Sequence, residues 1–172
     1  MIEKIISNVV DIIQSAGGQI VGRTRLQKIV CLLELAGMDS GFQFEYHHYG
    51  PYSEKLSDAV AMAVMSNEID EDIIYANWGG GYSVYKVNPP TSSSFVDVDN
   101  DRTRLIKKAA SANSIVLELA ATAAYLAKEG ISDPWGETEQ RKYDKAQKGR
   151  LGQAKSLYRE LRKIVPDLPE IP

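Results

Sequence analysis

The 172-residue chain carries 20 basic and 23 acidic side chains, a formal net charge of −3, and 44% hydrophobic residues. This is the composition of an ordinary globular domain, and its slight acidity argues against a general nucleic-acid coat protein. No apolar run approaches the roughly 18 residues of a membrane span, so no membrane association is expected. Cys31 is the single cysteine and cannot form an internal disulfide, and the N-terminus lacks signal-peptide features. Both observations favour the cytoplasm.

The charge is distributed unevenly along the chain. Residues 54–72 contain six acidic side chains and one lysine, a net charge of −5. Residues 141–163 contain nine basic and two acidic side chains, a net charge of +7. Such a split can draw neighbouring copies together or mark a surface for a partner. Homo-oligomer formation and binding of another molecule therefore both stay open.

The first two elements are predicted to be helices. Apolar residues recur at helical spacing over residues 2–16, and Gly17-Gly18 supplies the tight turn that ends this helix. Residues 22–37 repeat the pattern with apolar side chains on almost every side. This second helix is therefore expected to be covered on most faces and to lie at the centre of the core.

The middle of the chain is predicted to begin with a strand and a third helix. The aromatic run 43–49 favours a short strand, and Gly50-Pro51 favours a turn after it. Ser53 is the expected N-cap of a helix over residues 54–65.

A hairpin is predicted next. Two β-prone runs, 73–78 and 82–87, flank the sequence Gly79-Gly80-Gly81. The order helix, helix, strand, helix, hairpin is close to that of a winged-helix domain in which the hairpin is the wing. A short α+β domain of another topology gives a similar pattern. Residues 1–90 are predicted to form this winged-helix-like domain.

The rest of the chain is predicted to be helical. Residues 91–100 are expected to be a linker, and residues 101–172 a helical bundle that packs on or beside the first domain. Within this segment Gly130 ends one helix, Asp133-Pro134-Trp135 starts the next, and the last covers residues 149–165. The predicted fold class is α+β, mostly α.

Two short motifs carry a family resemblance. The sequences Gly-Arg-x-x-Leu-Gln-Lys at 22–28 and Tyr-Gly-Pro-Tyr-Ser at 49–53 resemble motifs of the YwgA-like family of bacterial and archaeal proteins. More distantly, they resemble the Panacea (SocA-like antitoxin) domain. The stretch 114–135 is similar to the second half of some YwgA-like chains. Panacea domains are associated with neutralising diverse toxins, and some with a proteolytic-adaptor role. The resemblance therefore implies a protein partner, a toxin or other regulator.

No catalytic constellation, metal site or cofactor site is predicted. His47 and His48 are neighbours on a predicted strand, so their side chains point to opposite faces and cannot easily chelate one ion. Cys31, inside an apolar helix, is expected to act as a small hydrophobe. The glycines at 79–81 lack the lysine of a phosphate loop, and the acidic cluster 68–72 lacks the spacing of a calcium loop.

Two function classes remain. The first is a non-enzymatic protein–protein interaction and regulatory module, antitoxin- or adaptor-like, with an exposed aromatic patch composed of Tyr46, Tyr49, Tyr52 and Trp78. The alternative is a nucleic-acid-binding winged-helix regulator, with phosphate contacts from Arg23, Arg25, Lys28, Lys155, Arg159 and Arg162. The cations near residues 23–28 can also be ordinary surface charge, with one arginine paired to a carboxylate. Those of the last helix can also be a solvated face, or can meet an acidic protein or the acidic middle of the chain. Because the third helix, which usually enters the major groove, carries Glu54 and Asp58, the first class ranks higher.

Overall fold

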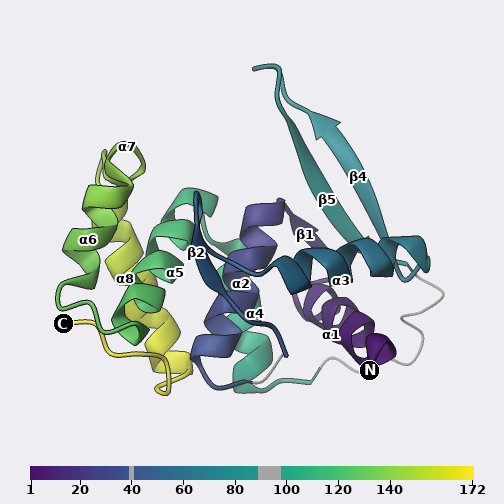
Figure 1. Ribbon diagram of the computed structural model, residues 1–172, viewed down its shortest axis with the longest axis horizontal. Coiled ribbons are helices and arrows are strands. Elements are labelled where there is room, and N and C mark those ends of the chain that lie inside the picture. Colours follow the sequence, from purple (N-terminus) through teal and green to yellow (C-terminus); the bar gives the residue numbers. More distant parts are fainter. Residues whose placement is uncertain (39–40, 89–97) are drawn as a thin grey trace.

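The computed structural model describes residues 1–38, 41–88 and 98–172 (Figure 1). The fold is α+β and mostly helical. In chain order the elements are α1 (Ile2–Ser15), β1 (Gln19–Val21), α2 (Arg23–Leu35), β2 (Glu45–His47), β3 (Gly50–Tyr52), α3 (Glu54–Met65), β4 (Ile69–Tyr75), β5 (Gly81–Val87), α4 (Asp101–Ser111), α5 (Ser114–Lys128), α6 (Pro134–Arg141), α7 (Tyr143–Ala146) and α8 (Arg150–Ile164). Seven of the ten predicted linker residues, 91–97, lie outside the described residues.

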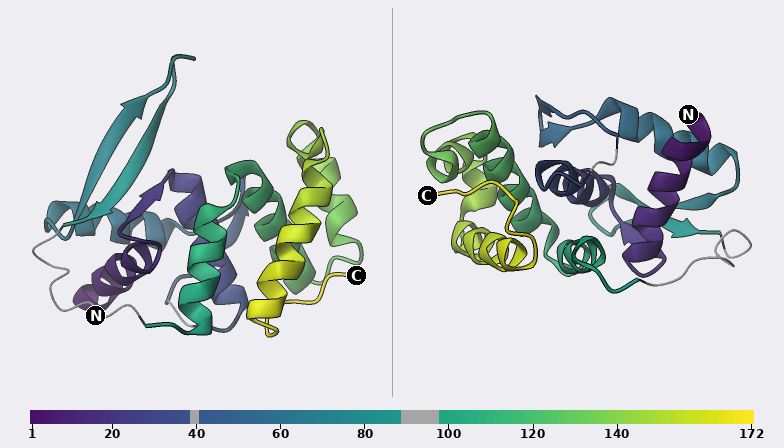
Figure 2. Two further views of the ribbon diagram at one scale, coloured as in Figure 1. Left: turned by 180° about the vertical axis from the view of Figure 1, so that it is seen from behind. Right: turned by 90° about the horizontal axis from the view of Figure 1, so that it is seen from below.

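Helix α2 is the central element, as the sequence predicted. All eight residues from Leu26 to Leu33 are buried. They make more than two helical turns, so this part of the helix is covered on every side. The helix packs against α4 and α5 on one side and against β1, β3 and β5 on others. Figure 1 and Figure 2 both show α2 between α1 and α5.

A three-stranded antiparallel sheet has the order β1-β5-β4. Strand β4 begins four residues earlier than predicted, because the acidic residues Asp70, Glu71 and Asp72 hide its strand pattern. Strand β1 was missed altogether, because its three residues are too few to show alternation. It pairs only with the inner half of β5, at residues 84–86. The outer halves of β4 and β5 therefore project from the body as a two-stranded hairpin (Figure 1).

The prediction of a turn at Gly50-Pro51 was wrong. These residues begin β3, which pairs antiparallel with β2, and the turn falls at His48-Tyr49. Proline is tolerated here because both strands of a two-stranded ribbon are edge strands. Gly50 has φ +92, a left-handed conformation that favours glycine.

The five C-terminal helices share one hydrophobic core with the N-terminal elements. Four alanines of α5 are fully buried: Ala120, Ala121, Ala123 and Ala124. Their small size lets α5 pack closely between α2 and α8. The side chains of Asn100, Asn113 and Asp133 cap α4, α5 and α6. The three caps mark where α4, α5 and α6 begin.

Candidate functional site

The two sequence motifs meet in the structure and hold each other. The Gln27 side-chain amide donates to the Ser53 carbonyl oxygen at 2.9 Å and accepts from the Ser53 amide at 2.8 Å. The ammonium group of Lys28 donates to the carbonyl oxygen of Pro51 at 2.7 Å. Ser53 also accepts from the amide of Leu56 and so caps α3. The motif residues thus fix the β2–β3 hairpin and the start of α3 on α2.

A charged cluster, buried except for Lys145, lies next to this junction. Glu118, on α5, accepts from Lys142 at 2.9 Å and from Lys145 at 2.8 Å. Lys28 is 1% exposed, and its ammonium group interacts electrostatically with the same carboxylate. Three lysines around one glutamate leave an excess of positive charge, and burial lowers the pKa of Lys28 to about 8. A lone glutamate in the apolar α5 sequence was the available signal for this cluster, and the sequence prediction missed it.

Gly50 lies between the hairpin and this cluster. A Cβ atom at this position would lie 2.6 Å from the hydroxyl oxygen of Thr122 and 3.6 Å from the Lys142 side chain. Only glycine therefore lets β3 approach α5 this closely. Within the Tyr-Gly-Pro-Tyr-Ser motif, packing thus explains Gly50 and hydrogen bonding explains Ser53.

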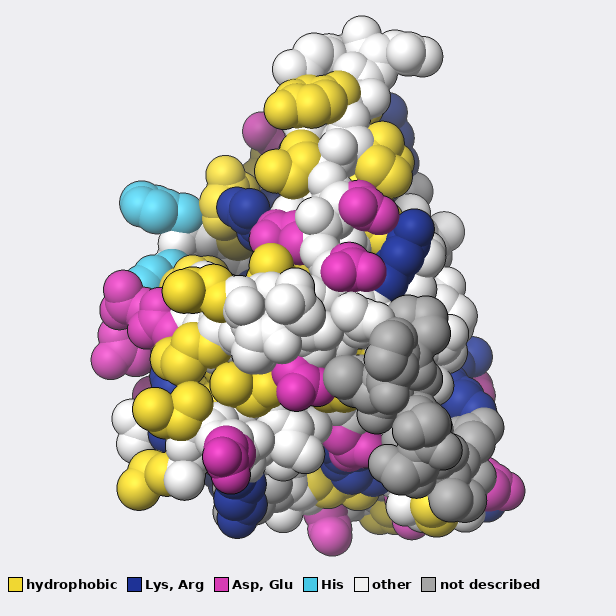
Figure 3. All heavy atoms as spheres, turned by 90° about the vertical axis from the view of Figure 1, so that its right-hand side faces the viewer, with side chains coloured by type: hydrophobic (Ala, Val, Ile, Leu, Met, Phe, Trp, Pro, Cys, Tyr) yellow, Lys and Arg dark blue, Asp and Glu magenta, His cyan; other side chains and the backbone are white. Residues whose placement is uncertain are grey.

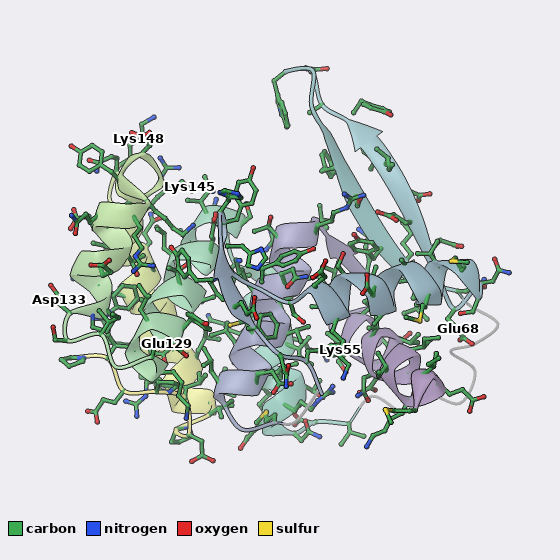
Figure 4. All side chains as sticks on the ribbon, viewed as in Figure 1. Lys55, Glu68, Glu129, Asp133, Lys145 and Lys148 are labelled. Atoms are coloured by element: carbon green, nitrogen blue, oxygen red, sulfur yellow. The ribbon has the colours of Figure 1, made fainter. Side chains whose placement is uncertain are left out.

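The predicted aromatic patch is divided between two places. The β2–β3 hairpin carries three of the four residues: Tyr46 on β2, Tyr49 in the turn and Tyr52 on β3. Cationic side chains of α6 and α7 lie against the rings of Tyr46 and Tyr49. The Arg141 guanidinium lies 4.6 Å from the ring centroid of Tyr46. The Lys145 nitrogen lies 5.1 Å from that of Tyr49, and Figure 4 shows Lys145 beside the hairpin.

Trp78 lies elsewhere, in the turn of the β4–β5 hairpin, and its side chain is 77% exposed. Figure 1 shows this tip far from the β2–β3 hairpin. The prediction of a single patch was therefore wrong. The reason is that the aromatic residues belong to two separate hairpins whose relative placement the chain order does not fix.

The predicted phosphate-binding cations of α2 are engaged within the protein. Arg23 pairs with Glu71 at 3.2 Å, and Arg25 donates to the carbonyl oxygens of Val21, Ala110 and Ala112. Lys28 is buried, so the prediction that it faces a phosphate was wrong. Its long side chain reaches inward to a backbone carbonyl, which periodicity alone cannot reveal.

The predicted basic residues of α8 lie together at the surface, as Arg23 also does. Lys155, Arg159 and Arg162 line a hollow of about 430 Å³ beside Trp135. The Lys155 nitrogen lies 6.0 Å from the Trp135 ring, and Arg162 donates to the backbone oxygens of Leu168 and Pro166. Of the predicted cationic site, α8 therefore keeps three cations grouped around one hollow.

The β4–β5 hairpin exposes apolar side chains that the sequence prediction did not single out. Ile73 is 55% exposed and Tyr75 79%, and Ile74 and Tyr82 are also exposed. Figure 3 shows the face of the molecule that carries this hairpin. Hydrophobic side chains gather on the hairpin and below it, with acidic side chains among them. The signal was present as three consecutive apolar residues, Ile73-Ile74-Tyr75, in a hairpin with little sheet to cover it.

A hollow of about 270 Å³ lies at the base of the same hairpin. Its floor is apolar, with Leu26, Leu56 and Val60, and Tyr52 also lines it. On the hairpin side, Glu71 accepts from Ser83 at 2.6 Å and from Arg23. These bonds hold the pKa of Glu71 below its usual value.

The structure offers little for chemistry at Cys31. The thiol is buried, and burial raises its pKa to about 12. Within the described part of the chain, no three His, Cys, Asp or Glu side chains are placed to hold a metal ion. No helix in the described ranges is long and apolar enough to cross a lipid bilayer.

Comparison with known proteins gives one informative match. The chain is 29% identical over 127 residues to the uncharacterized protein YwgA of Bacillus subtilis strain 168, covering 69% of this chain and 72% of YwgA. This similarity supports a relationship to the YwgA-like family. No protein-family model matches the chain. No solved structure matches it either.

Replacing Gln27 by alanine is expected to lower the free energy of unfolding by about 2–3 kcal/mol, because the buried Ser53 amide loses its acceptor. Urea denaturation measures this change. Gln153→Ala, at an exposed position of α8, is the control and should stay within about 0.5 kcal/mol of the wild type. Equal stability of the two variants would contradict a structural role for Gln27.

The lowered pKa of Lys28 predicts a pH dependence of stability. Between pH 8 and its unfolded value of 10.5, the unfolded chain keeps a proton that the folded chain has released. The free energy of unfolding of the wild type should therefore rise with pH relative to Lys28→Met, by about 2–3 kcal/mol across that window. Denaturation at several pH values measures the difference, and the exposed Lys55→Met is the control. Parallel curves for wild type and Lys28→Met would contradict the burial of a titrating amine.

Proposed function

We propose that this chain is a protein–protein interaction module whose partner docks on the β4–β5 hairpin. The observation that carries the proposal is the exposure of Ile73, Tyr75 and Trp78 on an element that projects from the body. Single exposed apolar residues are common, but a contiguous group on a protruding element is typical of a binding surface. Tyrosine and tryptophan are also the side chains that most often anchor interfaces.

The charges around the hairpin define the partner's chemistry. Asp70 and Asp72 lie on β4, and Glu68, labelled in Figure 4, precedes it. An apolar centre with acidic neighbours favours a partner that presents apolar side chains with basic residues around them. Such charge pairs speed association and select the partner, whereas the aromatic anchors supply most of the affinity.

The arrangement of elements supports a winged-helix assignment within this proposal. The order of α1, α2 and α3 and of the sheet β1-β5-β4 supports this assignment, with the β2–β3 hairpin as an insertion between α2 and α3 and the β4–β5 hairpin as the proposed wing. The likeness of the two motifs to the Panacea domain supports an antitoxin- or adaptor-like role, in which the partner is a toxin or another regulator.

Nucleic-acid binding is the second candidate function. The observation that favours it is the group of cations on α8, Lys155, Arg159 and Arg162, around one hollow. The acidic start of α3 and the internal bonds of Arg23 and Arg25 count against it. The protein-binding proposal therefore ranks first.

The proposal predicts that the double variant Tyr75→Ala, Trp78→Ala loses its partner. We expect at least a tenfold lower yield of the partner when the tagged chain is used to capture it from the cells in which it occurs, because two anchors are removed. Tyr143→Ala, which removes an exposed tyrosine from α7, is the matched control and should capture the partner as the wild type does. Quantitative mass spectrometry reads the yields. Undiminished capture by the double variant would exclude the hairpin as the docking surface.

A further inference from the structure

Strand β4 is an edge strand, so the backbone hydrogen-bonding groups along one of its sides have no partner strand in the part of the chain that the structure describes. The sheet order places β5 on the other side of β4. Two hydrogen bonds fix which residues face β5: Asn88 N–H donates to Glu68 O, and Ala76 N–H donates to Gly80 O. Bonded pairs alternate along an antiparallel ladder, so the even-numbered residues of β4 bond to β5. The backbone N–H and C=O groups of the odd-numbered residues, Ile73 and Tyr75 among them, point to the open edge.

The two faces of β4 differ in chemistry. Glu71, Ile73 and Tyr75 share the face that borders the hollow at the hairpin base. Asp70 and Asp72 share the opposite face with Ile74. A strand added to this edge would place alternate side chains on these two faces. Its residues would therefore meet Ile73 and Tyr75 on one face, where the carboxylate of Glu71 is already bonded to Ser83 and Arg23, and the carboxylates of Asp70 and Asp72 on the other.

We infer that β4 accepts an extended segment of a partner protein as an added strand, in which apolar and basic residues alternate. This inference rests on the proposed function and names how the partner binds. Main-chain hydrogen bonds to Ile73 and Tyr75 supply affinity, and the alternating side chains supply selectivity.

A second copy of this chain is the less suitable occupant. If two β4 strands paired about a two-fold axis perpendicular to the sheet, Asp70 and Asp72 of both copies would share one face. Like charges on adjacent strands are destabilising. Asp72 already forms an ion pair with Lys86 of its own chain at 3.3 Å. A partner strand that carries lysine or arginine adds further cations beside Asp70 and Asp72.

Proline substitution separates backbone pairing from side-chain docking. The N–H of Ile73 points to the open edge, so Ile73→Pro removes a donor for the added strand without removing a bond to β5. Ile73→Ala is the matched control, because it shortens the same side chain and keeps the N–H group. Thermal unfolding and circular dichroism of both variants check that the hairpin remains folded.

The probe is a nine-residue peptide with blocked ends in which valine and lysine alternate, and its binding is followed by fluorescence polarisation. A peptide of the same composition with its valines and lysines in two blocks is the comparison. We expect at least tenfold tighter binding of the alternating peptide. We also expect at least a tenfold loss of that binding in Ile73→Pro, against at most threefold in Ile73→Ala.

Three outcomes would overturn the inference: no binding of the alternating peptide, equal binding of both peptides, or equal effects of the two substitutions. A dimer of the free chain that Ile73→Pro abolishes would also overturn it, because a second copy would then occupy the edge. The proposed function is judged separately. One result is that the double variant Tyr75→Ala, Trp78→Ala loses the natural partner while Ile73→Pro retains it. That result would support side-chain docking on the hairpin and would exclude strand addition.

Discussion

The bidentate contact between the Gln27 side chain and the backbone of Ser53 is the constraint on which the rest of the N-terminal arrangement depends. It joins the central helix to Ser53, the residue that follows β3 and caps α3. The adjacent hydrogen bond from the Lys28 ammonium group to the Pro51 carbonyl oxygen holds strand β3 of the β2–β3 hairpin, two residues before Ser53. Because all these groups are buried, water cannot replace the bonds, and a change at either motif leaves polar groups without partners. The start of helix α3 is therefore fixed on α2, and the body of α3 packs against α1.

This arrangement separates the residues that hold the protein together from those available to a partner. Lys28, Gln27 and Gly50 are buried in the junction, whereas Ile73 and Tyr75 lie on a hairpin that β1 supports only at its base. A rigid scaffold that presents a projecting strand keeps that strand extended before binding, which lowers the entropy cost of association. The apolar hairpin is exposed to solvent at a cost in free energy, and a partner that covers it regains that free energy.

Much of the fold could be predicted from the sequence, because the signals are local. The limits of α3 follow from Ser53 and the apolar spacing after it, and Gly79 to Gly81 mark the hairpin. The candidate binding surface was harder to predict, because side-chain burial depends on tertiary contacts. Lys28 looks like a surface cation in the sequence, yet it lies inside because β3 crosses over α2. Trp78 and Tyr49 look like members of one patch, yet they occupy two hairpins. Strand β1 has only three residues, and without it the open outer half of the β4–β5 hairpin could not be deduced.

The central claim is that the β4–β5 hairpin binds the partner while the buried junction only supports it. Hydrogen exchange measured by mass spectrometry, on the free chain and on its complex with the captured partner, tests this claim most directly. The account predicts slower exchange in residues 69–82 on binding and unchanged exchange in α8. Slower exchange confined to α8, with residues 69–82 unaffected, would contradict it and would identify the basic helix as the binding surface.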